Sequence, residues 1–194
     1  MIQDAPEYYI FREGLNVSHF GLRAAQNRIA FDGLSILLDE VKPRQIIELG
    51  AGQGGLTIML GIWARINGAL FHSYELSCPL QLPELHEPLG IGLFAEDCMG
   101  KEASARIATV AQMDGVTLIL CDNGNKRTEF ARFQGVLKKG DIIMSHDFSD
   151  PERSIGSNYW GWSEFTPGDA TPYSVKRVYR ELLEYGAWGA YEKL

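Results

Sequence analysis

The chain has 194 residues and a formal net charge of −7, and 45% of its residues are hydrophobic against 22% charged. This composition excludes a disordered chain, and the lack of any apolar run near the roughly 20 residues of a spanning helix excludes a membrane protein. The negative charge argues against nucleic acid as a partner, because phosphate binding needs a concentrated basic surface. We therefore expect a small-molecule substrate, and a homo-oligomer stays open.

Cysteine usage and the N-terminal residues indicate a cytoplasmic protein. Cys78, Cys98 and Cys121 are odd in number and far apart, which predicts reduced thiols instead of a disulfide framework or a zinc site. The N-terminus, Met-Ile-Gln-Asp-Ala-Pro-Glu, lacks the basic stretch and apolar core of a secretory signal. The length suits one domain, so residues 1–194 are expected to form a single unit.

Short β-branched runs alternate with helical patterns, which is typical of a parallel sheet covered by helices on both faces. Strands are predicted at residues 45–49, 69–75, 92–95, 116–121 and 141–145. Helices are predicted up to residue 41, with Asp32 as N-cap, and over residues 54–66, 101–112 and 129–137. Prolines in residues 78–88 permit at most a short helix there. We therefore expect a doubly wound, mostly parallel α/β sheet.

The C-terminal part is less regular. The stripe Val175, Val178, Leu182 predicts a helix that starts near Pro172, and residues 188–191 suit a closing strand, which leaves no visible room for a seventh. Two segments, residues 1–18 and 150–172, do not fit the alternation. The second is rich in Gly, Ser and aromatic side chains, and long segments of this kind are often active-site lids. Both segments are candidate substrate lids. The aromatic side chains of the second, Tyr159, Trp160, Trp162 and Phe165, suit either a lid over the acceptor or a hydrophobic cluster or subunit contact, and both interpretations stay open.

A glycine-rich loop follows the first predicted strand. It reads Glu48-Leu-Gly50-Ala-Gly52-Gln-Gly54-Gly55, at the carboxyl end of a parallel strand, where open α/β sheets bind ligands. Gly50, Gly52 and Gly55 satisfy the dinucleotide pattern G-x-G-x-x-G, which by itself is a weak match. The loop therefore predicts a nucleotide-like cofactor without deciding which one.

Acids at three successive strand ends favour one cofactor. Glu48 precedes the glycines, Glu75 ends the second strand at a place suited to accept from two ribose hydroxyls, and Asp97-Cys98 follow the third strand. This series resembles the class I S-adenosylmethionine-dependent methyltransferases over about residues 30–148. The resemblance implies a Rossmann-like fold and S-adenosylmethionine as cofactor, with Asp97 near the adenine. The implied cofactor-binding residues are Glu48, Gly50, Gly52, Gly54, Glu75, Asp97, Cys98 and Asp122.

The fourth and fifth strand ends carry the chemistry. Asp122 follows the fourth strand and His146-Asp147 the fifth, so they should meet at one edge of the sheet. These positions are most similar to those of catechol-type and macrolide or sugar O-methyltransferases, in which acids hold a divalent cation that activates the acceptor hydroxyl. The resemblance implies magnesium or manganese bound by Asp122, His146 and Asp147, and methylation of a small-molecule hydroxyl.

This sequence departs from those families at several places. Lys126 matches a lysine that serves as base in the catechol enzymes, though its spacing from Asp122 is longer by one. His146 stands where those enzymes often carry an acid, and Phe148 where they carry an amide. Without a cation, His146 could be the general base while Asp122 holds the methionine amine. The candidate catalytic residues are thus Asp122, Lys126 and His146.

Two other functions stay open. One is an NAD(P)-dependent oxidoreductase, which the glycine pattern alone permits, although the chain has no clear Tyr-x-x-x-Lys pair. The other is a methyltransferase-like binding protein that has lost catalysis.

Overall fold

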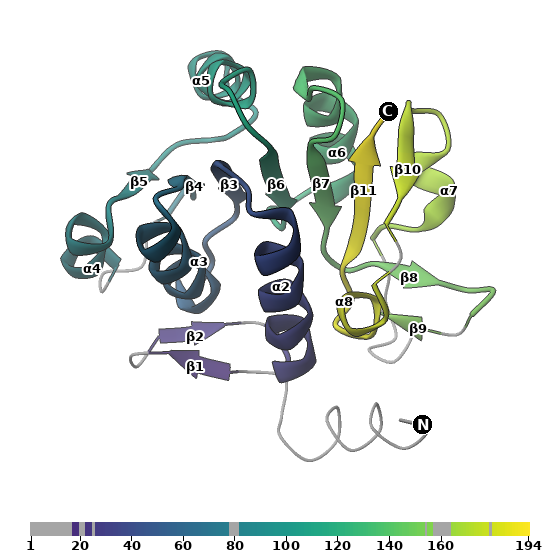
Figure 1. The fold of residues 1–194 in the computed structure, drawn as a ribbon, viewed down its shortest axis with the longest axis horizontal. Helices are drawn as coiled ribbons and strands as arrows, with labels where there is room; N and C mark the ends of the chain where they lie inside the picture. The colour runs from purple at the N-terminus through teal and green to yellow at the C-terminus, as the bar shows by residue number, and fades with distance from the viewer. Residues whose placement is uncertain are drawn as a thin grey trace.

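The computed structural model describes residues 17–19, 22–24, 26–77, 82–153, 155–156, 164–178 and 180–194. Its central feature is a seven-stranded sheet with the strand order β10-β11-β7-β6-β3-β4-β5 (Figure 1). The parallel strands are β3 (Gln45–Leu49), β4 (Leu70–Tyr74), β5 (Ile91–Phe94), β6 (Thr117–Cys121) and β7 (Ile142–Ser145). Two further strands, β11 (Gly189–Lys193) and β10 (Val175–Arg177), extend the sheet beyond β7; β11 runs antiparallel to both of its neighbours.

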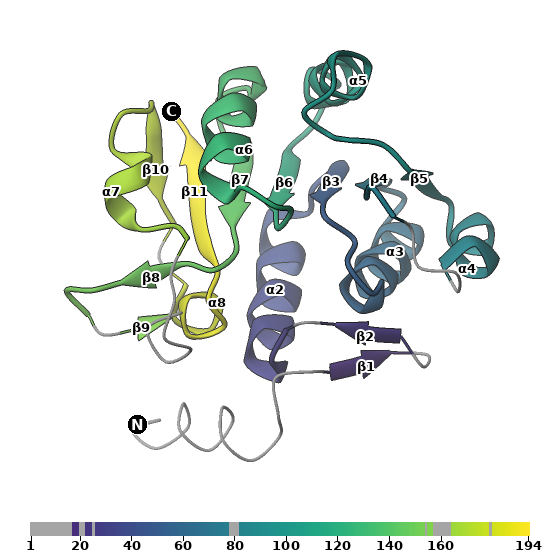
Figure 2. The ribbon, with the colours of Figure 1, turned by 180° about the vertical axis from the view of Figure 1, so that it is seen from behind.

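Helices cover both faces of the sheet (Figures 1 and 2). One face carries α2 (Arg28–Val41), α3 (Gly55–Asn67), α4 (Leu82–Leu89) and α8 (Glu181–Tyr185). The other carries α5 (Lys101–Ala111), α6 (Lys126–Phe133), a 3-10 turn (Gln134–Val136) and α7 (Pro167–Ala170). Successive side chains of a strand point to opposite faces, so Ile46 joins the first apolar cluster and Ile47 the second. Both strand faces are therefore apolar, as a buried parallel sheet requires.

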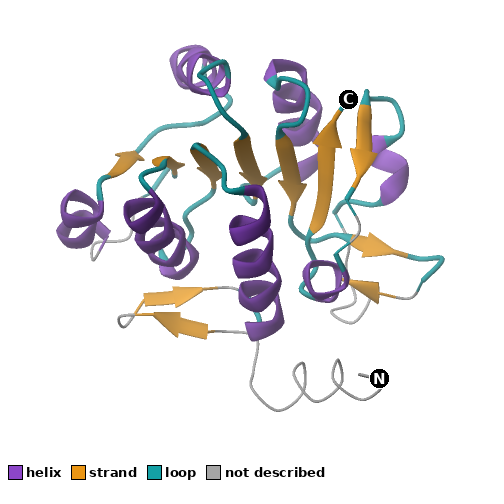
Figure 3. Cartoon of the chain, viewed as in Figure 1, coloured by secondary structure: helices purple, strands orange, loops and turns teal. Residues whose placement is uncertain are grey.

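Two small hairpins lie at the edge toward which β6 and β7 point (Figure 3). They are β1 (Val17–His19) with β2 (Leu22–Ala24), and β8 (Ser149–Asp150) with β9 (Ile155–Gly156). The start of α2 lies at this same edge (Figure 1). No helix among the described residues is long and apolar enough to cross a membrane.

The predicted doubly wound α/β fold is confirmed, and the first five predicted strands are present with small shifts at their ends. Two helix boundaries were wrong. The helix predicted over residues 129–137 begins earlier, because Asn125 caps it, and α6 runs from Lys126 to Phe133 before the 3-10 turn. Asn27, not Asp32, caps α2, because its side-chain oxygen accepts from the Ala30 backbone N–H at 2.9 Å while Asp32 lies inside the helix. Helix α2 therefore begins more than one turn earlier than predicted.

The prediction for the C-terminal part was also wrong. Residues 175–177 form strand β10, and within the described part of the predicted helix the helical residues are 181–185. Val175 pairs with Lys193 across the edge of the sheet, so its backbone is hydrogen-bonded by β11 and not by a helix. The residues that share a helical stripe in the sequence thus belong to two elements, and the sheet gains the seventh strand for which the sequence showed no room.

Candidate active site

The glycine loop leaves β3 in a left-handed backbone conformation. Gly50, Gly52 and Gly54 have φ angles of 99°, 52° and 86°, which residues with a Cβ rarely adopt. A Cβ on Gly50 would lie 2.4 Å from the backbone oxygen of Asp122, whereas a Cβ on Gly52 would meet nothing within 4 Å. Gly50 thus lets β3 and β6 approach each other, and the space around Gly52 stays open. Helix α3 begins directly after Gly54, which provides no side-chain cap, so the N-terminal end of the helix lies next to this loop.

Glu75 lies against the glycine loop. It follows β4, and its Oε2 accepts a hydrogen bond from the Gly52 backbone N–H at 2.9 Å. Its Oε1 accepts from the Leu76 N–H at 2.8 Å. The carboxylate is therefore fixed in direction beside the loop.

Asp97 and Cys98 follow β5. Asp97 is exposed and accepts from the Met99 backbone N–H at 2.9 Å. Cys98 is buried, and the Asn123 side-chain amide donates to its sulfur at 3.5 Å. Burial raises the pKa of the Cys98 thiol to about 11, so the thiol stays protonated at neutral pH. This predicted third motif thus lies beside the loop that follows β6.

Glu48 does not line the open side of the loop. It is fully buried, and its Oε2 accepts hydrogen bonds from the hydroxyls of Thr57 at 2.7 Å and Ser73 at 2.5 Å. Burial raises the pKa of Glu48 to about 8. The carboxyl group therefore orders the loop from beneath, by connecting β3 to α3 and to β4.

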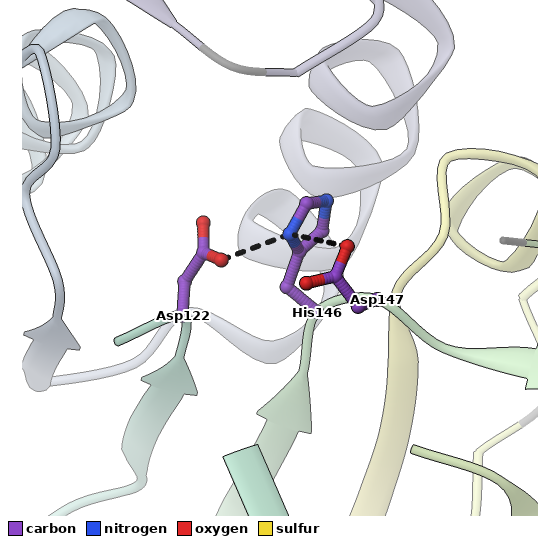
Figure 4. Close-up of side chains that lie close together, drawn as sticks. All are labelled: Asp122, His146 and Asp147. Carbon is purple, nitrogen blue, oxygen red and sulfur yellow. Dashed lines mark ion pairs between the residues drawn. The ribbon is translucent and has the colours of Figure 1, made fainter. Parts of the chain in front are cut away.

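Asp122, His146 and Asp147 come together at the ends of β6 and β7 (Figure 4). His146 Nδ1 lies 2.8 Å from Asp122 Oδ1 and 3.6 Å from Asp147 Oδ1. One donor atom from each of the three side chains lies within 4.8 Å of the others. Asp147 has a φ of 51°, a left-handed conformation that is uncommon for residues with a side chain. Strained backbone of this kind often accompanies functional sites, and here it aims the carboxylate back toward β6.

Further side chains contact the Asp122 and Asp147 carboxylates. The Lys126 Nζ lies 3.0 Å from Asp147 Oδ2, 3.3 Å from Glu164 Oε2 and 4.0 Å from Asp122 Oδ1. The amide nitrogen of Gln26 donates to Asp122 Oδ2 at 2.9 Å. The sequence had not pointed to Gln26 or Glu164, because neither belongs to a recognisable motif. The predicted residues thus meet as expected, and two unpredicted ones complete the cluster.

The cluster favours positive charge. Burial acts to lower the pKa of His146, but the neighbouring Asp122 and Asp147 carboxylates outweigh it, and the pKa is raised. Burial likewise opposes the charge of Lys126, yet Asp122, Asp147 and Glu164 raise its pKa, so the side chain remains an ammonium ion. The point between the two aspartates is therefore suited to a proton on His146 Nδ1 or to a metal cation.

The predicted aromatic lid is described only in part. Tyr159, Trp160 and Trp162 lie outside the described residues. Phe165 is 1% exposed and packs against Phe130 and Tyr191 in the core, so it is not available to cover a substrate.

No protein-family model and no curated protein matches this chain. Its structure is similar to that of CmcI with magnesium and S-adenosylmethionine, with a TM-score of 0.62 and 16% identity over 92% of this chain and 76% of CmcI. It is also similar to 1,6-didemethyltoxoflavin-N1-methyltransferase of Burkholderia thailandensis with S-adenosylhomocysteine, with a TM-score of 0.53 and 15% identity over 86% of this chain and 78% of that one. MycE, the methyltransferase from the mycinamycin biosynthetic pathway in complex with magnesium and S-adenosylhomocysteine, gives a TM-score of 0.54 and 15% identity over 84% of this chain and 48% of MycE.

At these identities the similarity establishes the fold. The chain has the Rossmann-like fold of class I methyltransferases, with the antiparallel strand β11 inserted between β7 and β10.

Proposed function

We propose that the protein is an S-adenosylmethionine-dependent methyltransferase that methylates a hydroxyl oxygen of a small molecule and releases S-adenosylhomocysteine. The observation that carries this proposal is the contact between Gly50 and Asp122. It joins a left-handed glycine loop, with Glu75 fixed beside it, to the cluster of Asp122, His146 and Asp147. A cofactor on the loop would therefore lie next to charged groups able to hold an acceptor oxygen.

The cofactor side uses groups that match the parts of S-adenosylmethionine. The Glu75 carboxylate suits the ribose hydroxyls, and the exposed Asp97 suits the adenine amine. The start of α3 offers N–H groups to the carboxylate of the methionine part. Open space around Gly52 leaves room for the backbone to approach the ligand.

The acceptor side fits a divalent cation. Asp122 Oδ1, His146 Nδ1 and Asp147 Oδ1 converge, and the other oxygens of the two aspartates are already held by Gln26 and Lys126. Such outer contacts are typical of ligands that are kept in position for a metal. A cation bound there would lower the pKa of the acceptor hydroxyl and direct its oxygen. One nitrogen and two oxygen ligands suit manganese better than magnesium.

The chain's own residues align the partners. Because the sulfonium of the donor is already activated, positioning of the acceptor is the main task that remains. Lys126 stays charged and holds Asp147, so we assign it a positioning role and not that of a base. Its ammonium group also offers positive charge near an oxyanion of the acceptor.

Replacing Glu75 by alanine is expected to weaken binding of S-adenosylhomocysteine by about 10- to 150-fold, because a charge-assisted acceptor for the ribose is worth roughly 1.5–3 kcal/mol. Titration calorimetry on the full chain measures this directly. Glu102→Ala, which removes an exposed acid of α5, is the matched control and should bind as the unaltered protein does. Unchanged affinity in Glu75→Ala would remove the ribose assignment. Tighter binding of NAD or NADP than of S-adenosylhomocysteine would favour the oxidoreductase reading.

Replacing Asp147 by asparagine is expected to weaken Mn²⁺ binding by at least about tenfold and leave S-adenosylhomocysteine affinity within about twofold, because Asp147 faces the acceptor side. His146→Ala should narrow the preference for Mn²⁺ over Mg²⁺, since a nitrogen ligand discriminates between these ions where oxygens do not. Electron paramagnetic resonance of free Mn²⁺ and competition with Mg²⁺ measure both effects. Failure of the unaltered protein to bind Mn²⁺, together with turnover that a chelator does not change, would leave His146 to act as a base without a cation.

A further inference from the structure

Asp122 is connected to Trp188, near the C-terminus, through the buried side chain of Gln26. Gln26, which is 4% exposed, precedes the N-cap of α2 and donates from its amide nitrogen to Asp122 Oδ2 at 2.9 Å. The Gln26 amide oxygen accepts from the indole N–H of Trp188 at 2.8 Å. Trp188 is 1% exposed and comes directly before β11. A continuous hydrogen-bonded chain thus runs from Trp188 through Gln26 to Asp122.

The direction of this chain is fixed by chemistry. An indole N–H can only donate, so the group of Gln26 that faces Trp188 must be the amide oxygen. The amide nitrogen is then left for Asp122, which as a carboxylate can only accept. Flipping the amide would set two donors against each other at Trp188 and two acceptors at Asp122. The buried indole therefore selects the one orientation of Gln26 that is useful to the site.

The same tryptophan also contacts the next member of the cluster. The rings of Trp188 and His146 have centroids 4.8 Å apart, at an interplanar angle of 41°. With Asp122 Oδ2 occupied by Gln26, Oδ1 is the oxygen that faces His146 Nδ1, at 2.8 Å. Gln26 and Trp188 thus act on both Asp122 and His146 without being candidate ligands themselves.

We propose that Gln26 and Trp188 form a positioning pair for the candidate cation site: they fix the Asp122 carboxylate so that Oδ1 faces the donor atoms of His146 and Asp147. This inference rests on the proposed function, because only a protein that binds a cation at this site needs the Asp122 carboxylate held in this orientation. Outer-shell partners of this kind typically change metal affinity by about 10- to 100-fold when they are removed.

The test uses Mn²⁺ as the probe on the full chain. Trp188→Phe keeps the ring beside His146 but removes the N–H donor, and Gln26→Met keeps the bulk but removes both hydrogen bonds. Each should raise the Kd for Mn²⁺ by about tenfold or more. The matched control is Trp63→Phe, which removes an indole N–H bonded to the exposed Asp39 carboxylate at 3.0 Å, between α3 and α2; it should leave the Kd unchanged.

A double variant separates positioning from mere packing. If Trp188 acts through Gln26, then Trp188→Phe should add less than a twofold effect in a Gln26→Met background. Effects that multiply in the double variant, or single variants that bind Mn²⁺ as the unaltered protein does, would overturn the proposal.

A second readout needs neither cation nor cofactor. Hydrogen exchange of the Trp188 indole N–H, followed by nuclear magnetic resonance, should quicken in Asp122→Ala because the hydrogen-bonded chain loses its charged end. Exchange at the Trp63 indole should stay as it was. If the unaltered protein binds no Mn²⁺, the cation proposal fails, but the exchange measurement still tests whether Trp188 and Gln26 are coupled to Asp122. An unchanged exchange rate at the Trp188 indole in Asp122→Ala would contradict that coupling.

Discussion

Replacing Gly50 by alanine is expected to destabilise the protein by about 2–5 kcal/mol. The new Cβ would lie 2.4 Å from the backbone oxygen of Asp122 and 2.9 Å from the backbone nitrogen of Asn123, so one of the two strand ends must move. Displacing packed backbone costs roughly 1–3 kcal/mol. The left-handed conformation adds about 1–2 kcal/mol for any residue that has a Cβ.

Gly52→Ala is the matched control for this prediction. Gly52 has a φ of 52°, but a Cβ there would meet nothing within 4 Å, so only the cost of the left-handed conformation, about 1–2 kcal/mol, is expected. Urea unfolding of both variants measures the difference. Ligand affinity gives a second comparison. Gly52→Ala should fold and yet bind S-adenosylhomocysteine more weakly than the unaltered protein, because its methyl group enters the space assigned to the ligand. Equal unfolding free energies in the two variants would contradict the Gly50–Asp122 contact.

Replacing Glu48 by glutamine is expected to remove a large part of the pH dependence of stability between about pH 5 and pH 8. The pKa of Glu48 is raised from 4.5 to about 8 by burial. As the pH rises through this window, the unfolded chain releases the proton while the folded protein keeps it, so folding becomes less favourable. The stability associated with the protonated carboxyl is therefore complete below pH 4.5 and lost by about pH 8, and it amounts to at most about 5 kcal/mol.

Glutamine stays neutral at every pH and can still accept from Thr57 and Ser73 through its oxygen. The difference in unfolding free energy between Glu48→Gln and the unaltered protein should therefore grow in favour of the variant from pH 5 to pH 8. Denaturant melts at several pH values measure it, with Glu102→Gln as an exposed control that should show no trend. A constant difference across the window would mean that Glu48 ionises normally in the folded protein.

The parallel part of the fold could be predicted because its signals are local. Residues 118–121 are uniformly apolar, as a central strand must be, and Asn67-Gly68 end α3 with a left-handed glycine cap. The C-terminal part could not be predicted, because the strand at residues 175–177 depends on pairing with residues 191–193. A three-residue edge strand carries no periodicity of its own, so its one apolar residue, Val175, fits the stripe of the helix that follows.

The site divides in the same way. Asp122, His146 and Asp147 could be placed because each follows a predicted parallel strand, and the carboxyl ends of such strands share one edge. Gln26 and Glu164 could not, since they reach the cluster from segments outside the alternating pattern. The burial of Glu48 beneath the loop was also hidden, because the hydroxyls that hold it come from Thr57 and Ser73 on two other elements.

The hydrogen bond between Trp188 and Gln26 joins residues that are 162 positions apart in the chain. Closing so long a loop is entropically costly, so we expect this contact to form late in folding. The side-chain hydrogen bonds of the glycine loop, by contrast, come from Thr57, Ser73 and Glu75, all within a short stretch of chain. A refolding protein should therefore regain its ability to bind S-adenosylhomocysteine before the Asp122 carboxylate is locked, with a cofactor-competent but chemically idle species in between. Stopped-flow refolding, with the ligand and with Mn²⁺ as separate reporters, would resolve the two events in time.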